Sequence, residues 1–311
     1  MATPFSNAEG FIFHSDEYSR ELIPRQLNIA EVVMFIESRI DNSTRLVPLQ
    51  QAEKLVDFYD LQEVLPHFER LLNRREASNT DLMRSAIEVR IVARVGTRAA
   101  SDFAGAYYLY LAQRADTTAL LDLLISVYEA LGSAADPRPL AGAIAQRLQT
   151  LEPQVKTNPD LIHEFQTLER LSAYTLPRAV QANQAKDRVR SILNPAQRIE
   201  EEVNIYLGLK PGFPEILPAW AARQLRREVW ADRPEQQTVR ADSPARRSEL
   251  VAAFRAALGR VEGNQTMPQG QKDFIVGSCL RAVEFFGGAL SEAEREIVNR
   301  PGRQFYVLSN E

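Results

Sequence analysis

The stretch that decides the fold covers residues 119–141 and reads ALLDLLISVYEALGSAADPRPLA. Its first half is the most apolar run of the chain and has a helical period, interrupted by two carboxylates. Gly132 follows directly, where a helix commonly ends on a left-handed residue. After a proline-containing turn, a second periodic segment begins. The stretch therefore predicts two helices joined by a short loop, over 117–131 and 137–151.

The same pattern recurs along most of the chain. A side chain able to cap a helix stands directly before a proline three times, and Ser291 opens a sequence with the spacing of a capping box. These three caps are Asn158, Asn194 and Ser243. Gly96 and Gly208 follow periodic runs in the same way as Gly132. The expected helices are 48–60 paired with 64–76, 80–95 with 100–113, 117–131 with 137–151, and 159–173 with 177–192, followed by 195–207, 219–231, 244–259 and 273–287.

The first helices of these pairs recur every ~32 to 42 residues, a period typical of helix-pair repeats. Ala104-Gly105-Ala106 and Ala141-Gly142-Ala143 also lie 37 residues apart. Residues 130–141 resemble the turn within a bacterial HEAT-type repeat, in which Leu-Gly ends the first helix and an Asp-Pro-Arg-like turn opens the second. The resemblance is good over one repeat, partial over 80–192 and absent elsewhere.

This resemblance implies an all-α fold, a right-handed-type α-solenoid of stacked helix pairs. In such an array, small residues at repeated positions let adjacent helices approach closely. The alternative is an irregular multi-helix bundle, in which the repeated glycine-flanked alanines arise by chance. Strand signals are scarce, and only 304–308 could form a short extended piece.

Two breaks in the rhythm divide the chain. Residues 208–218 hold two glycines and three prolines, and 231–247 form a polar, arginine-rich stretch typical of a solvated linker. The expected domains are an N-terminal arm and capping helix (1–47), a helical-repeat array (48–207), a Pro/Gly and polar connecting region (208–243) and a C-terminal helical unit (244–311).

Composition limits the class of protein. The 311 residues carry a net charge of -4 with a pI near 5.7, which disfavours a dedicated nucleic-acid binder. A single cysteine excludes an internal disulfide framework and suits a reducing compartment. No segment approaches the ~20 apolar residues that a membrane span needs. We expect a soluble, cytoplasmic chain that does not enter a membrane; its oligomeric state is left open.

Local catalytic motifs are missing from the sequence. The three histidines, His14, His67 and His163, are far apart, and Cys279 lies inside an apolar helix where a thiol is inert. The sequence has no nucleophile elbow and no glycine-rich phosphate loop. Two glutamate clusters, 200–202 and 292–296, fall in the first turns of expected helices, where carboxylates stabilise the helix. We therefore expect no catalytic residue, metal or cofactor, and a protein that is not an enzyme.

Candidate binding residues come from two places. The segment 219–260 contains nine arginines, no lysine and both tryptophans of the chain, a composition suited to phosphate, carboxylate or base stacking. The alternative is a solvated helix face opposite an apolar stripe. Tyr107 and Tyr110 share one helix face and would anchor a partner if exposed, although burial is the commoner fate of such residues. The candidates are Trp220, Arg223, Arg226, Arg227, Trp230, Tyr107 and Tyr110.

The leading functional hypothesis is a non-catalytic helical-repeat scaffold or adaptor that binds another protein through an extended surface. One alternative is a HEAT-like nucleic-acid-binding protein or DNA-repair-type enzyme that uses the 219–260 region, an analogy of architecture alone. Another is a regulatory subunit or processed substrate with an exposed 231–247 loop.

Overall fold

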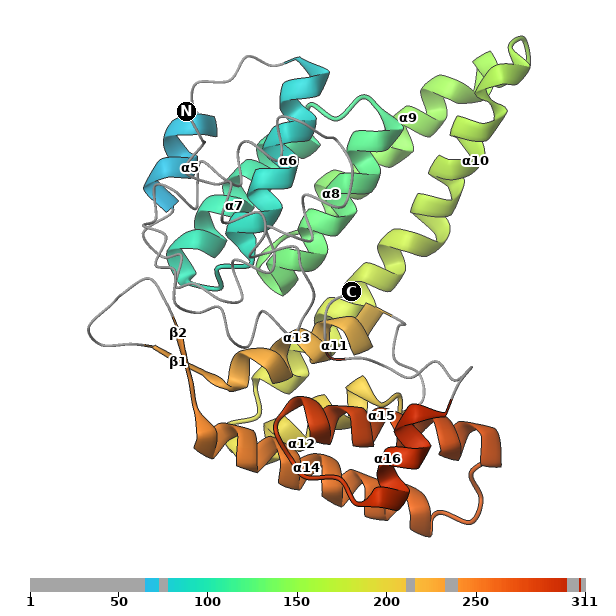
Figure 1. Cartoon of the computed structure of the whole chain (residues 1–311). Coiled ribbons are helices and arrows are strands. Elements are labelled where there is room, and N and C mark those ends of the chain that lie inside the picture. The colour runs from blue at the N-terminus through green and yellow to red at the C-terminus, as the bar shows by residue number, and fades with distance from the viewer. Residues whose placement is uncertain (1–64, 73–77, 211–215, 233–239, 301–307, 309–311) are drawn as a thin grey trace, which may run out of the picture. The chain divides into compact units, whose positions relative to one another are not determined.

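The computed structural model describes residues 65–72, 78–210, 216–232, 240–300 and 308 (Figure 1). Within these residues the fold is all-α, as the sequence predicts, with one short pair of strands. No described helix is long and apolar enough to cross a membrane. The expected N-terminal arm and capping helix, the expected helix 48–60 and the extended piece 304–308, apart from Leu308, lie outside the described residues.

The chain divides into two compact units, residues 1–187 and 188–311. The described helices of the first unit are α5 (Leu65–Leu72), α6 (Asn79–Ala93), α7 (Arg98–Ala112), α8 (Thr118–Leu131), α9 (Arg138–Val155), α10 (Ile162–Arg170) and α11 (Leu176–Arg190), the last of which crosses the boundary. Short 3₁₀ turns cover Gly132–Ala134 and Pro159–Leu161.

Helices of the first unit contact both their sequence neighbour and the helix two further along. α6 packs against α7 and α8, while α7 also contacts α9, and α8 also contacts α10. The stretch that opened the sequence analysis forms the α8–α9 hairpin (Figure 1). Its turn begins at Gly132, whose φ is +74°, and continues to Asp136, whose carboxylate accepts the backbone N–H of Arg138 at 3.0 Å. The predicted helix pair and its glycine stop are confirmed.

Most predicted helix ends are also confirmed. The side chains of Asn158, Asn194 and Ser291 accept backbone N–H groups at the starts of their helices. Gly96 and Gly208 have φ values of +81° and +65°, as the left-handed position requires. The side chain of Ser243 does not cap its helix.

The predicted loop between helices 159–173 and 177–192 is wrong. α10 continues through a π-helical turn, Leu171–Thr175, directly into α11. In this turn the N–H of Leu176 bonds to the carbonyl of Leu171, five residues back. Pro177 comes next and has no N–H to donate, so the wider turn lets the chain pass this proline without ending the helix.

The repeated glycines do not mark close helix contacts. A Cβ added at Gly105 or Gly142 would meet nothing within 4 Å, so the expected close approach at these positions is wrong. Among the described glycines, Gly288 has the least room for a side chain. A Cβ added there would lie 2.7 Å from Cγ1 of Val283 and 2.9 Å from Cγ1 of Val251.

The second unit contains α12 (Pro195–Tyr206), α13 (Ile216–Glu228), α14 (Pro244–Gly263), α15 (Gln269–Phe285) and α16 (Glu292–Asn299). α12 packs against α13 and α14, and α14 packs against α15. The structure therefore places α12 and α14 in one unit, whereas the sequence analysis ended the array at 207 and began a separate unit at 244. The aromatic core joins Tyr206, Phe254 and Phe286, with ring centroids about 6 Å apart (5.8 and 6.0 Å).

The start and end of the expected linker 231–247 are ordered secondary structure. β1 (Trp230–Asp232) pairs antiparallel with β2 (Arg240–Asp242), and Trp230 lies opposite Asp242. α14 then begins at Pro244. This pair of strands was not predicted because each strand has only three residues, too few for an alternating pattern to be recognised.

Candidate functional site

The two tryptophans of the candidate segment have different environments. Trp220 is 4% exposed and lies in α13 beside the buried residues Leu217 and Ala221. Its indole N–H is buried and has no hydrogen-bond partner. The apolar stripe of α13 is thus wide enough to include Trp220, and the prediction that this residue binds a ligand at the surface is wrong. Trp230, at the start of β1, is half-buried.

The three arginines of α13 do not gather at one site. Arg226 donates a hydrogen bond of 2.5 Å to the backbone carbonyl of Leu308, whose side chain is buried. The Arg226 guanidinium therefore joins α13 to Leu308, a structural role. Arg223 is half-buried and does not line the pocket described next.

Arg227 and Trp230 come together in one open pocket. The pocket has a volume of about 310 Å³ and is lined by Arg227, Glu228, Trp230, Ser243 and Arg246; we call it the Trp230 pocket. Its residues come from the end of α13, the first strand residue and the start of α14. The backbone N–H of Ser243 donates to the carbonyl of Val229 at 2.7 Å, which fixes these segments to one another.

Two ion pairs involve residues that line the Trp230 pocket. Arg198 of α12 donates to the Glu228 carboxylate at 2.9 Å, and Arg246 donates to that of Glu249 at 2.6 Å. Glu202, which interacts electrostatically with Glu228, is 3% exposed; burial and then Glu228 raise its pKa to about 8, so it holds its proton at neutral pH.

Arg247 does not line the Trp230 pocket but stabilises its wall. Its Nε donates to both carboxylate oxygens of Asp242 at 2.7 and 2.6 Å, and its Nη1 donates to the carbonyl of Phe285 at 3.2 Å. The guanidinium thereby joins β2, α14 and α15 into one rigid frame.

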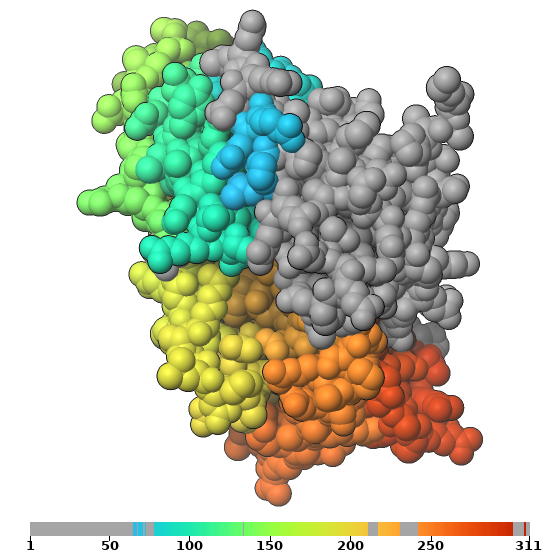
Figure 2. All heavy atoms as spheres, turned by 90° about the vertical axis from the view of Figure 1, so that its left-hand side faces the viewer, coloured from blue at the N-terminus to red at the C-terminus, as the bar shows by residue number. Residues whose placement is uncertain are grey.

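A second candidate surface lies on α7, where Phe103, Tyr107 and Tyr110 form an aromatic strip. The ring centroids of Phe103 and Tyr107 lie 4.9 Å apart, and those of Tyr107 and Tyr110 lie 6.0 Å apart. Tyr110 is 39% exposed and the Arg114 guanidinium stacks over its ring at 3.9 Å, whereas Tyr108 is fully buried. The prediction that Tyr107 and Tyr110 share one helix face is confirmed. The expectation that these tyrosines are buried is wrong for Tyr110. α7 lies on the face of the first unit turned to the viewer in Figure 2.

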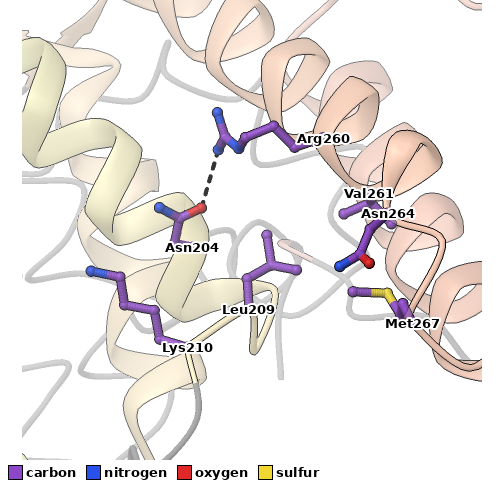
Figure 3. Close-up of a pocket in the computed structure, with 7 residues that line it drawn as sticks. All are labelled: Asn204, Leu209, Lys210, Arg260, Val261, Asn264 and Met267. Atoms are coloured by element: carbon purple, nitrogen blue, oxygen red, sulfur yellow. Dashed lines mark hydrogen bonds between the residues drawn. The ribbon is translucent and has the colours of Figure 1, made fainter.

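A further pocket lies between α12 and α14 in the second unit. It has a volume of about 250 Å³ and is lined by Asn204, Leu209, Lys210, Arg260, Val261, Asn264 and Met267 (Figure 3). Its polar groups bond mainly to the protein itself. Arg260 donates to Asn204 at 3.1 Å and pairs with Glu200 at 3.1 Å, and Lys210 pairs with Glu201. The two contacts of Arg260 join α12 and α14, and we assign the pocket a structural role.

Glu164 and the two glutamate clusters have structural surroundings. Glu164 accepts hydrogen bonds from Thr118 and Arg147, both at 2.8 Å, and so links α8, α9 and α10; the Arg147 guanidinium lowers the pKa of this carboxyl. Residues 200–202 lie in the middle of α12 rather than in its first turn, a correction to the sequence analysis. Glu292 and Glu294 do lie in the first turn of α16. Among the described residues, no group of three or more histidine, cysteine, aspartate or glutamate side chains is placed to hold a metal ion.

Comparison with known proteins adds no relative. No family model, no curated protein and no solved structure matches this chain.

Proposed function

We propose that the chain is a non-catalytic helical-repeat scaffold or adaptor that binds another protein through an extended surface. The observation that carries this proposal is the packing order in the first unit. In the two hairpins α6–α7 and α8–α9, the first helices α6 and α8 are neighbours, and so are the second helices α7 and α9. This order is the one expected of a solenoid, whose second helices together form a continuous binding face.

The aromatic strip of α7 supports the same proposal. Tyrosine and phenylalanine are enriched in protein–protein interfaces because they bury a large area with little loss of side-chain freedom. Tyr110 and Leu109, each 39% exposed, lie on α7, the second helix of its hairpin, and support the proposal. We therefore expect the partner to contact α7 first.

Site-specific photo-crosslinking tests this function. A photoreactive phenylalanine analogue replaces Tyr110 in the full chain, which is expressed in its own cells and irradiated. The matched control replaces Tyr174, which is 57% exposed and also carries an arginine four residues on, Arg178, over its ring at 4.8 Å. The proposal predicts a defined crosslinked partner at position 110 and much less at 174. Recovery of the uncrosslinked chain alone at both positions would overturn it.

A further inference from the structure

Glu202 places an acid on the packed face of α12. Its side chain is 3% exposed, and Ile199 and Tyr206, three residues before it and four after it, are buried too. Its Oε2 atom is buried and has no hydrogen-bond partner among the described residues. An ionised carboxylate is strongly disfavoured in such a place. The proton of Glu202 is therefore part of the packed structure of the second unit.

Arg198 lies within reach of two carboxyl groups. Its Nη2 donates to Oε1 of Glu228 at 2.9 Å, between side chains that are 31% and 18% exposed. Glu202 follows Arg198 by four residues, a spacing that brings side chains of one helix together, and the Arg198 charge acts on the Glu202 carboxyl. While Glu202 keeps its proton, Glu228 is the carboxylate that holds Arg198. An ionised Glu202 would compete for the same guanidinium.

Glu228 depends on Arg198 because of its place in α13. It is the last residue of the helix, where the negative end of the helix dipole disfavours a carboxylate. The helix end itself is weakly bonded, since the Val229 N–H donates to the Arg226 carbonyl at 3.4 Å. Trp230 follows directly and begins β1. The pair of Arg198 and Glu228 thus fastens the last turn of α13, and the residues after it, to α12.

We propose that Glu202, Arg198 and Glu228 form a proton-sensitive latch for the end of α13, which we call the Glu202 latch. With Glu202 protonated, Arg198 holds Glu228 and the last turn of α13 stays on α12. When Glu202 releases its proton to solvent, its carboxylate becomes the partner of Arg198, and the last turn of α13 opens. Glu228 and Trp230 both line the Trp230 pocket, so the latch makes the shape of that pocket depend on pH.

The charges around Glu202 set the pH at which the latch responds. Glu228 of α13 disfavours the ionised form of Glu202, whereas Arg198 of α12 and Arg190, the last residue of α11, favour it. Burial is the largest influence and raises the pKa of Glu202 to about 8. The latch is therefore closed at neutral pH and opens under mildly alkaline conditions.

The arginines of α14, which also packs against α12, have carboxylate partners other than Glu202. The pairs are Arg246 with Glu249, Arg247 with Asp242, Arg255 with Glu294, and Arg260 with Glu200. Arg246 also interacts with Glu228, but Glu249 is its main partner. Arg198 is thus the cation for which Glu202 and Glu228 compete.

Hydrogen–deuterium exchange of the full chain tests the latch. Glu202→Gln has the shape of the protonated side chain but cannot ionise, so it should keep the latch closed at every pH. At about pH 9, the last turn of α13 should exchange about fivefold or more faster in the wild type than in Glu202→Gln, whereas at about pH 6 the two should agree. Comparing the two proteins at one pH cancels the intrinsic dependence of exchange on pH. Equal exchange at the higher pH would overturn the proposal.

The distribution of the exchange separates the latch from a general loss of stability. A latch predicts that the difference is confined to the end of α13 and the strand pair. A difference spread evenly over α12, α14 and α15 would show that ionised Glu202 loosens the whole unit, and this result would also overturn the latch.

Two further variants serve as controls. Glu200→Gln changes a carboxyl of the same helix that is 54% exposed and pairs with Arg260, and it should leave the exchange of α13 as in the wild type at both pH values. Arg198→Gln removes the shared cation and should open the last turn at about pH 6 already, with exchange raised about fivefold there and unchanged in α15. A closed last turn in Arg198→Gln would contradict the latch.

Quenching of Trp230 fluorescence by acrylamide gives an independent measurement. The chain has two tryptophans, so Trp220→Phe leaves Trp230 as the single emitter. Quenching in this variant should increase as the pH rises, with a midpoint near the Glu202 pKa of about 8. The increase should be lost in the double variant Trp220→Phe/Glu202→Gln. Constant quenching in the first variant, or the same increase in both, would overturn the coupling between Glu202 and the Trp230 pocket.

Discussion

The ammonium group of Lys186 donates a hydrogen bond of 2.9 Å to the backbone carbonyl of Glu129, 57 residues earlier in the chain. Glu129 lies in the last turn of α8, where carbonyl groups lack helical partners and carry partial negative charge. Lys186 is 4% exposed and also bonds to Asn183, whose amide donates to the carbonyl of Tyr128. The two α11 side chains therefore cap the end of α8 at the hairpin that decides the fold.

Replacing this buried cation should destabilise the first unit. Lys186→Met keeps the apolar stem but removes the donor to the Glu129 carbonyl, and we expect a loss of about 2 kcal/mol in the free energy of unfolding. Urea denaturation followed by circular dichroism measures it. Lys156→Met, at an exposed position just after α9, is the control and should be neutral within ~0.5 kcal/mol. Equal stability of the two variants would contradict the capping role.

The buried carboxyl of Glu202 should make stability depend on pH. Its pKa is raised to about 8 by burial and then by Glu228, so the folded state holds a proton that the unfolded state releases near pH 4.5. The contribution of Glu202 to stability is thus largest below the ordinary pKa of a glutamate and falls as the pH rises toward 8, by up to about 1.4 kcal/mol per pH unit.

Glu202→Gln should remove this dependence. The free energy of unfolding of the variant should therefore rise relative to that of the wild type as the pH rises. Denaturation midpoints across this pH range measure the difference. Glu200→Gln, on the same helix but exposed, should leave the slope as in the wild type. Parallel profiles for the wild type and Glu202→Gln would refute the assignment.

Two glycines should respond in opposite ways to alanine. Gly288→Ala places a methyl group 2.7 Å from Val283 and 2.9 Å from Val251 in the core, and should cost about 1–3 kcal/mol. Gly142→Ala adds a methyl group in open space within α9 and should stabilise by up to ~1 kcal/mol. Thermal unfolding of both variants checks the pair; a stabilising change at 288 would be inconsistent with the packing.

The single cysteine should be unreactive in the native protein. Cys279 is fully buried in α15, and burial raises the pKa of its thiol to about 12, so almost no thiolate exists at neutral pH. Alkylation by iodoacetamide, followed by mass spectrometry, should be negligible in buffer and complete in urea. Rapid alkylation of the native chain would show that α15 is less well packed than described.

Local signals predicted much of the fold. Asn158, Asn194 and Gly132 were recognised because capping and left-handed positions depend on a few adjacent residues. The continuous helix through Leu171–Thr175 was not predicted, since a proline such as Pro177 normally ends a helix and the π-helical turn before it has no sequence signature of its own.

Only some of the residues that line the Trp230 pocket were predicted from the sequence. Composition singled out the segment that holds Arg227 and Trp230, but it equally selected Trp220, which is core, and Arg226, which holds Leu308. Burial of a helix residue depends on how wide a face its neighbours cover, and this is a tertiary property. Arg246 was counted among the arginines of the segment but not selected, because its place beside Trp230 is set by the strand pair, which the sequence did not reveal.

Hydrogen–deuterium exchange of the chain with and without its crosslink-identified partner tests the central claim most directly. If stacked hairpins form one extended binding face, backbone protection should appear together on the second helices α7 and α9. Protection confined to a single helix or pocket, or no protection in either helix, would contradict an extended interface.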